Sequence, residues 1–233
     1  MSVTGAQAQS YSLTIPLPAR AAGLAGDLTL PRAARGLVIF AHGSGSSRLS
    51  PRNRMVARTL QDAGFGTLLF DLLTPQEEAV DAVSGQLRFD ILFLAGRLEA
   101  VTEWVAAQTF AQPLALGYFG ASTGAAAALV ASARHPGLVA AIVSRGGRPD
   151  LAGPLLREVA APTLLIVGAA DTTVLRLNRT ALASLGSREK ELAVVTGATH
   201  LFEEPGTLER AAELAAGWFA RHLTSRQSSA VPG

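Results

Sequence analysis

The 233-residue chain contains no cysteine, which excludes disulfide bonds, thiolate nucleophiles and thiolate metal ligands. Only 16% of the residues are charged, the formal net charge is +2, and no block of consecutive Lys or Arg occurs, so nucleic-acid binding is not indicated. Aromatic residues are few and scattered, and no cluster of His, Asp and Glu has the spacing of metal ligands. We therefore expect neither a metal site nor a bound cofactor.

Long apolar runs are also missing. No uncharged apolar stretch approaches the ~18 residues of a membrane helix, and the N-terminus lacks the basic segment and apolar core of a signal peptide. We therefore expect a cytoplasmic protein that makes no membrane contact, with its oligomeric state left open. Hydrophobic residues, in contrast, account for 48% of the chain, which at this length suits one domain with a large core.

Apolar runs alternate with helical patterns along most of the chain. Two short strands, over 12–17 and 27–30, are expected to form an antiparallel hairpin at one edge. The other apolar runs predict strands over 37–41, 65–70, 114–119, 139–143, 163–167 and 192–195, and most of them are uniformly apolar, as 37–41 is, which is typical of a strand buried on both faces. Helical patterns occur at 51–63, 91–105, 124–130 and 174–185 and from Pro205 onward. The sequence therefore predicts an α/β fold with a mainly parallel central sheet and helices on both faces.

A single domain is expected to span residues 1–233, with flexible tails at 1–10 and 224–233. The sequence contains no internal repeat and no interdomain linker. Residues 71–86 form an acidic, proline-containing stretch that could shade a site as a small lid, and no longer insertion is present. We therefore expect little or no cap over the sheet.

The segment Gly120-Ala121-Ser122-Thr123-Gly124 lies between an apolar strand run and a small-residue helical pattern. A Gly-x-Ser-x-Gly run with these flanks predicts a sharp strand-to-helix turn, which projects the serine hydroxyl outward as a nucleophile. The run alone could arise by chance in a glycine-rich chain, and it is the flanks that make the match specific. Ser122 is therefore the candidate nucleophile.

A base and an acid follow Ser122 in the chain, each after a predicted strand. His200 follows 192–195 and can take the serine proton, because the pKa of imidazole lies close to neutral pH. Asp171 follows 163–167 and can hold the imidazole in the required tautomer. The alternatives for the acid are Asp150, Glu203 and Glu204. Two further histidines, His135 and His222, are interpreted as capping or surface residues.

Negative charge that develops on a reacting carbonyl oxygen needs backbone donors, and two are predicted. One is the N–H of Thr123, the residue after the candidate nucleophile. The other is the N–H of Ser44, in the loop His42-Gly43-Ser44-Gly45 that follows an earlier strand. His42 is expected either to brace this loop or to contact the substrate.

Several arginines follow predicted strands and are therefore expected near the same edge of the sheet. One interpretation pairs them with acidic residues such as Asp71 and Glu203. The other assigns Arg48 or Arg145 to a carboxylate or phosphate of the substrate, because a planar guanidinium can donate two parallel hydrogen bonds. The arginines concerned are Arg48, Arg52, Arg54, Arg145 and Arg148.

Taken together, these segments resemble the α/β-hydrolase superfamily and, within it, the small capless group that is similar to dienelactone hydrolases. The resemblance covers about residues 35–222, and the stretches that carry it are 42–48 with 50–54, the Ser122 turn, 144–148 and 197–206. It implies an α/β-hydrolase fold. Dienelactone hydrolases proper use a cysteine nucleophile, which this chain lacks, so the expectation shifts from dienelactone opening to a serine esterase.

These observations predict a serine hydrolase that cleaves small or short-chain carboxylic esters through an acyl-serine intermediate, without a cofactor. Thioesterase or lactonase activity with the same Ser-His-Asp triad is the nearest alternative. A binding module that keeps the fold without turnover is the alternative from another class. Hydrolysis of haloalkanes or epoxides is disfavoured, because those mechanisms need a carboxylate at the position of Ser122.

Overall fold

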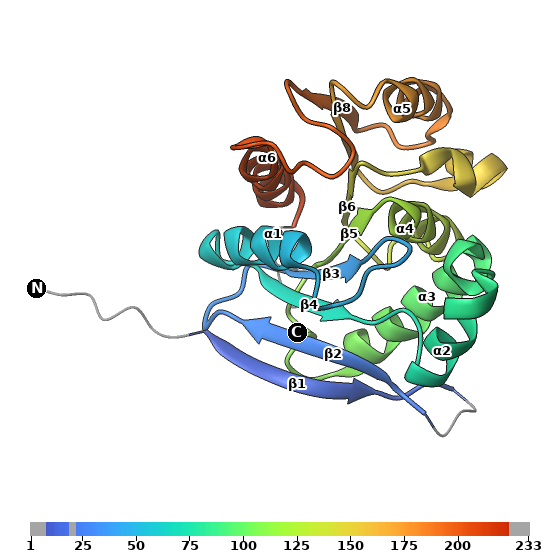
Figure 1. Ribbon diagram of the computed structural model, residues 1–233. Helices are drawn as coiled ribbons and strands as arrows, with labels where there is room; N and C mark the ends of the chain where they lie inside the picture. Colours follow the sequence, from blue (N-terminus) through green and yellow to red (C-terminus); the bar gives the residue numbers. More distant parts are fainter. Residues whose placement is uncertain (1–7, 19–21, 224–233) are drawn as a thin grey trace, which may run out of the picture.

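The computed structural model describes residues 8–18 and 22–223 and centres on an eight-stranded sheet in the order β1-β2-β4-β3-β5-β6-β7-β8 (Figure 1). The strands are β1 Gln9–Ile15, β2 Leu24–Leu30, β3 Leu37–Ala41, β4 Gly66–Phe70, β5 Leu116–Ala121, β6 Ala141–Arg145, β7 Thr163–Gly168 and β8 Lys190–Val195. From β4 across to β8 the neighbouring strands are parallel, whereas β2 is antiparallel to both β4 and β1. The expected hairpin is therefore present at the edge of a mainly parallel sheet.

Helices cover both faces of this sheet. One face carries α1 (Pro51–Asp62) and α6 (Thr207–His222), and the other carries α3 (Ile91–Ala107), α4 (Thr123–Arg134) and α5 (Thr172–Ser184) (Figure 1). Two short 3₁₀ segments and one further helix complete the described part: η1 Leu87–Phe89, η2 Pro149–Glu158 and α2 Pro75–Ser84. None of the helices in the described ranges has both the length and the apolar character needed to cross a bilayer.

The central strands are mainly apolar because both of their faces are buried. In β3, Val38 and Phe40 pack into the core beneath α1 and α6, whereas Leu37 and Ile39 pack into the core on the opposite face. Side chains alternate between the two faces of a strand, so a strand covered on both sides places nearly all of its side chains in an apolar core. This burial explains why continuous apolar runs located the strands in the sequence.

The helix starts follow local rules that the sequence only partly disclosed. Ser50 caps α1 by accepting a hydrogen bond from the N–H of Asn53 at 3.3 Å, and Pro51 occupies the first turn, as expected from the sequence. A capping box, Thr74 with Glu77, starts α2 inside the stretch interpreted only as a lid. The terminal helix begins at Thr207 rather than at Pro205.

The N-terminal tail expected over residues 1–10 is too long, because Gln9 already pairs with Leu30 in the β1–β2 hairpin. This start was missed because the first residues of β1 are polar and exposed, and an exposed edge strand needs no apolar run. The tail expected over 224–233 lies outside the described residues. The segment η2 was also missed, since its residues include Gly153 and Pro154, which normally interrupt helices.

The packing around the Ser122 turn predicts that Gly124→Ala lowers the free energy of unfolding by at least about 2 kcal/mol. A Cβ atom at this position would lie 2.2 Å from the carbonyl oxygen of Ala41, which is backbone and cannot move aside freely. The measurement is urea denaturation followed by circular dichroism.

The matched control is Gly217→Ala on the exposed side of α6, where an added Cβ meets nothing within 4 Å. This change should raise the free energy of unfolding by about 0.5–1 kcal/mol, because alanine restricts the unfolded chain more than glycine does. Equal effects of the two substitutions would contradict the close approach described for Gly124.

Candidate active site

Ser122 lies at the sharp turn between β5 and α4. Its φ of 49° and ψ of −120° place a non-glycine residue in a strained backbone conformation. The turn is held against the end of β3, since Gly124 packs on the Ala41 and His42 carbonyl oxygens. Gly43 also approaches the Ser122 side chain, so that an added Cβ there would lie 3.0 Å from the serine Cβ. The turn therefore has the geometry expected of a nucleophile elbow.

Asp171 and His200 are hydrogen-bonded to each other. The Nδ1 atom of His200 lies 2.7 Å from Oδ2 of Asp171. The other carboxylate oxygen, Oδ1, accepts a hydrogen bond from the N–H of Val174 at 3.3 Å and caps α5. Because one oxygen is fixed by the helix start, the other is held toward the imidazole, and the Nδ1–H tautomer of His200 is favoured.

The loop that carries His200 is fixed by a glutamate that the sequence presented only as a rival acid. Glu204 accepts hydrogen bonds from the Thr199 hydroxyl at 2.6 Å and from the Thr199 N–H at 3.1 Å. These bonds from Thr199 lower the pKa of the Glu204 carboxyl below its usual value. Glu204 thus holds the residue directly before His200, a role that the five-residue spacing alone did not disclose.

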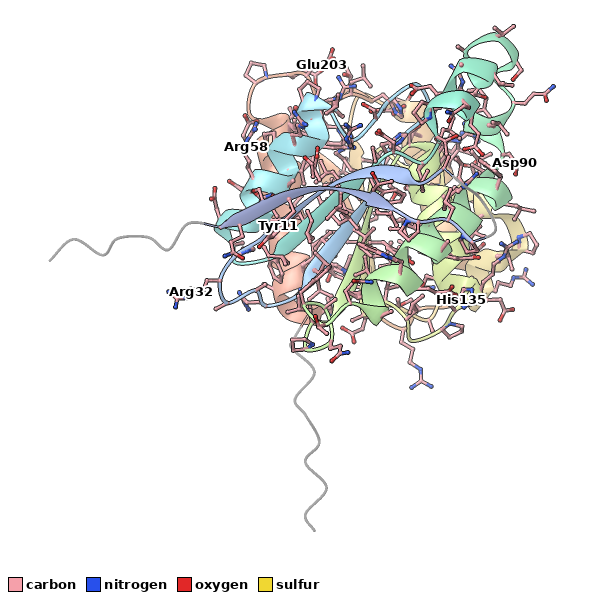
Figure 2. The ribbon with its side chains drawn as sticks, turned by 90° about the horizontal axis from the view of Figure 1, so that it is seen from below. Tyr11, Arg32, Arg58, Asp90, His135 and Glu203 are labelled. Carbon is pink, nitrogen blue, oxygen red and sulfur yellow. The ribbon has the colours of Figure 1, made fainter. Side chains whose placement is uncertain are left out.

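The other alternative acids also have partners elsewhere. Asp150 accepts two hydrogen bonds from Arg148, at 2.7 and 2.8 Å, and Glu203 accepts one from Arg52 at 2.9 Å. In Figure 2, His135 lies far from Glu203. Among the three strand-end and loop acids considered with Asp171, none takes its place beside the imidazole.

Ser122 and His200 line one cavity of about 250 Å³, together with Gly43, Ser44 and Arg145. A direct hydrogen bond between the Ser122 hydroxyl and the imidazole is absent among the contacts of residues 8–18 and 22–223. Links of this kind are often long before substrate binds and shorten in the reacting complex. The structure therefore brings the base to the cavity of the serine and forms the acid–base half of the arrangement.

The two predicted oxyanion donors lie close together, but one of them already has an acceptor. The N–H of Ser44 donates a 2.9 Å hydrogen bond to Oγ1 of Thr123. The N–H of Thr123 belongs to the first turn of α4, where backbone donors have no acceptor within the helix. The Thr123 hydroxyl thus ties the loop to the helix start, and an incoming oxyanion would share the Ser44 donor with it.

His42 acts as a brace, because the backbone engages both nitrogens of its ring. The N–H of Leu72 donates to Nε2 at 3.0 Å, so Nε2 carries no proton and Nδ1–H donates to the Gly43 carbonyl oxygen at 2.9 Å. Burial lowers the pKa of His42 below its ordinary value of 6.5. The substrate contact expected for His42 therefore has no ring nitrogen available, and bracing, the other interpretation, describes the observed contacts.

The arginines at this edge divide into paired and unpaired groups. Arg48 bonds Asp71 through its side chain and its backbone N–H and also lies 3.6 Å from Asp27, so the substrate contact expected for it is replaced by ion pairing. Arg145 differs, because it is buried and lines the cavity that contains Ser122. The sequence could not separate these two arginines, since both follow strands and the difference depends on the acids that packing places beside them.

A second cavity of about 300 Å³ lies on the other side of the Ser44 loop. Leu72, Leu73 and Leu94 line it, together with Glu78 and Asp81 of α2. The stretch expected to shade the site therefore does border a pocket, although that pocket does not contain Ser122 among its lining residues. In the described residues, no group of three or more His, Asp or Glu side chains is arranged to hold a metal ion.

His42 should make the stability of the protein depend on pH. Its pKa is lowered in the folded state, so between that value and 6.5 the unfolded chain binds more protons than the native protein. Its contribution to stability is therefore complete above pH 6.5 and is lost as the pH falls from there toward the native pKa. The free energy of unfolding should fall less steeply from pH 7 to pH 5 in His42→Gln, which keeps an acceptor for Leu72 without titrating.

The control for this measurement is His135→Gln, which changes an exposed histidine whose Nε2 lies 3.7 Å from Glu99. It should leave the wild-type slope nearly unchanged. An identical slope in His42→Gln and in the wild type would contradict the buried, neutral state of His42.

Comparison with known proteins supplies the family. The model of the alpha/beta hydrolase fold family matches residues 36–231. A crystal structure of a dienelactone hydrolase from Anabaena variabilis is 51% identical, with a TM-score of 0.90 over 94% of this chain and 100% of that one. The protein Est1E from Butyrivibrio proteoclasticus shares the fold, with a TM-score of 0.72 at 14% identity over 90% of this chain and 99% of its own.

A protein of Mycobacterium tuberculosis, provisionally named a phosphoribosyl transferase, is 60% identical over 200 residues. The match covers 86% of this chain but only 44% of the relative, so the chain spans less than half the length of the curated relatives it matches. By its family model, its architecture and its similarity to the Anabaena protein, the chain belongs to the α/β-hydrolase family and, within it, to the dienelactone-hydrolase-like group.

Proposed function

We propose that this chain is a serine hydrolase that cleaves carboxylic esters through an acyl-serine intermediate. The observation that carries the proposal is the 2.7 Å contact between Asp171 and His200, together with the cavity that His200 shares with Ser122 at its strained turn. A serine hydroxyl is a weak nucleophile until a base removes its proton. The hydrogen bond to Asp171 leaves Nε2 of His200 unprotonated and therefore able to act as that base.

The first half of the reaction transfers the acyl group to the enzyme. Oγ of Ser122 attacks the ester carbonyl carbon while Nε2 of His200 takes the hydroxyl proton. The N–H groups of Thr123 and Ser44 stabilise the negative oxygen of the tetrahedral intermediate. The carbon–oxygen bond to the alcohol then breaks, and the imidazolium returns its proton to the departing alcohol.

The second half regenerates Ser122. A water molecule gives a proton to His200 and attacks the acyl carbon, and the second tetrahedral intermediate releases the carboxylic acid as the proton returns to Oγ. Asp171 remains ionised throughout and stabilises the imidazolium at each stage. The small cavity beside Ser122 favours short acyl groups over long ones.

Lactone hydrolysis is the second candidate, because the Anabaena neighbour is named a dienelactone hydrolase. A lactone is a cyclic ester, so the same steps apply, except that the alcohol stays attached to the acyl group. Hydrolysis of p-nitrophenyl esters, acyl thioesters and lactones by one preparation would rank these activities. The name of the mycobacterial relative does not favour a third candidate, since the chain matches under half of that protein.

A fluorophosphonate probe should label the wild-type protein at Ser122 and leave Ser122→Ala unlabelled, because the probe reacts with an activated serine oxygen. Turnover of p-nitrophenyl acetate should fall to background in the same variant. The matched control is Ser184→Ala near the end of α5, whose hydroxyl bonds only the Thr180 carbonyl oxygen. Labelling of Ser122→Ala at the wild-type level would refute the assignment of the nucleophile.

Asp171→Asn should lower kcat for p-nitrophenyl acetate by on the order of a thousandfold or more, because an amide donor favours the wrong tautomer of His200. The fold should survive, since asparagine can also accept the hydrogen bond from Val174 and cap α5. Asp150→Asn, which alters a carboxylate paired with Arg148, should change kcat less than about twofold. A similar loss in both variants would argue against a specific role for Asp171.

A further inference from the structure

Arg145 is a buried cation that lacks an anion. It is the last residue of β6, and only 7% of its surface is exposed. Nη2 makes a long contact of 3.4 Å to Oδ1 of Asn53, Nε–H has no acceptor, and the guanidinium carbon lies 5.7 Å from the centre of the Phe202 ring. Within the described ranges, no carboxylate lies within 4.0 Å of this guanidinium.

Buried charges are normally paired, because removing an ion from water is costly. Burial, with a smaller contribution from the charge of Arg52, lowers the pKa of Arg145 to about 10. The side chain is therefore still protonated at neutral pH. A buried charge kept in this way inside a catalytic cavity points to a ligand as the missing partner.

The rest of the cavity wall carries no negative charge. Its lining residues include no Asp or Glu, and three hydroxyl side chains besides Ser122 face it, from Ser44, Ser46 and Ser50. Arg52 also lines the cavity, but its charge is balanced at the rim by Glu203 at 2.9 Å. The second cavity, in contrast, is bordered by Glu78 and by the ion pair of Asp81 with Arg88, so its wall has no unbalanced positive charge to attract an anion.

The start of α1 adds partial positive charge to the same wall. Ser50, Arg52 and Asn53 belong to this helix start and line the cavity. Ser50 caps the N–H of Asn53, its carbonyl oxygen accepts from the N–H of Arg54, and Pro51 has no N–H, which leaves the N–H of Arg52 as the unpaired donor of the first turn within the described residues. A helix N-terminus is equivalent to about half a positive charge. Arg145 contributes one positive charge and the start of α1 about half of one, whereas the charge of Arg52 is balanced by Glu203. The wall therefore carries about +1.5 charges.

We propose that this cavity binds a phosphate monoester group of the substrate, with Arg145 as its principal ligand and the start of α1 as its second. A phosphate monoester carries about −1.5 to −2 charges at neutral pH, which matches the wall, whereas a carboxylate carries −1. This inference rests on the proposed ester hydrolysis at Ser122, and it makes the substrate a small ester that also bears a phosphate. Arg145 then selects the substrate and takes no part in the bond that breaks.

The experiment measures binding of inorganic phosphate to Ser122→Ala by calorimetry at pH 7.5 and constant ionic strength, so that no reaction occurs. Phosphate should bind one to one and at least tenfold more tightly than acetate. Adding Arg145→Met should weaken phosphate binding at least tenfold, while Arg58→Gln should change it less than twofold. Arg58 lies on the same helix α1 and does not line the cavity (Figure 2), so it controls for net charge.

Thermal unfolding separates a lost ligand from a lost fold. Without phosphate, Arg145→Met should unfold at the wild-type temperature or above, because it removes an unpaired buried charge. Phosphate should raise the unfolding temperature of the wild type and not that of Arg145→Met. If Arg145→Met does not fold, Arg145→Lys takes its place in the binding measurement. Lysine keeps the charge and loses the planar fork, so this variant should weaken phosphate binding by less than the tenfold expected for methionine.

Hydrolysis of p-nitrophenyl acetate distinguishes this inference from the proposed function. Phosphate should raise the KM of the wild type for this neutral ester and leave kcat unchanged. Turnover without phosphate binding, or phosphate binding that Arg145→Met does not weaken, would overturn the phosphate site and leave the esterase proposal intact. Acetate binding as tight as phosphate binding would also overturn it. Phosphate binding without any ester turnover would overturn the esterase proposal and support the anion site.

Discussion

The contact between Gly124 and the carbonyl oxygens of Ala41 and His42 fixes most of the site. Because helix α4 can begin against the end of β3, the strained Ser122 turn and the Ser44 loop lie side by side. The Thr123 hydroxyl then reaches the Ser44 N–H, and His42 joins the same loop to Leu72 after β4. Because Gly124 has no side chain, the ends of the three adjacent strands β3, β4 and β5 can share a single network of contacts that involve the backbone.

The charges around this network are arranged in opposite ways on its two sides. On one side, Asp171 is fixed by the start of α5 and balances the positive charge that His200 would acquire. On the other side, Arg145 is buried with no acid beside it in the described residues. A paired charge contributes to a fixed geometry, whereas an unpaired one favours whatever anion can reach it. The two halves of the cavity are therefore suited to different parts of one substrate.

Much of this arrangement could be predicted from the sequence, because it depends on local patterns. Uniformly apolar runs marked the central strands, and parallel strands place their carboxyl ends at one edge, so Ser122, Asp171 and His200 were expected there. The exposed start of β1 and the segment η2 lacked such patterns and were missed. The partners of individual side chains could not be predicted either. No local pattern indicated that the Thr123 hydroxyl would accept the hydrogen bond from the Ser44 N–H. None indicated that Arg48 would form an ion pair while Arg145 would not.

The pair formed by Arg52 and Glu203 connects the start of α1 to the loop that follows His200. It therefore links a residue that lines the cavity, Arg52, to a segment that lies far from it in the sequence. Exposed ion pairs contribute only about 0–1 kcal/mol and weaken as salt is added. The start of α1 and the loop after His200 are consequently joined by a contact that thermal motion breaks readily, so this side of the cavity can widen without any rearrangement of the sheet.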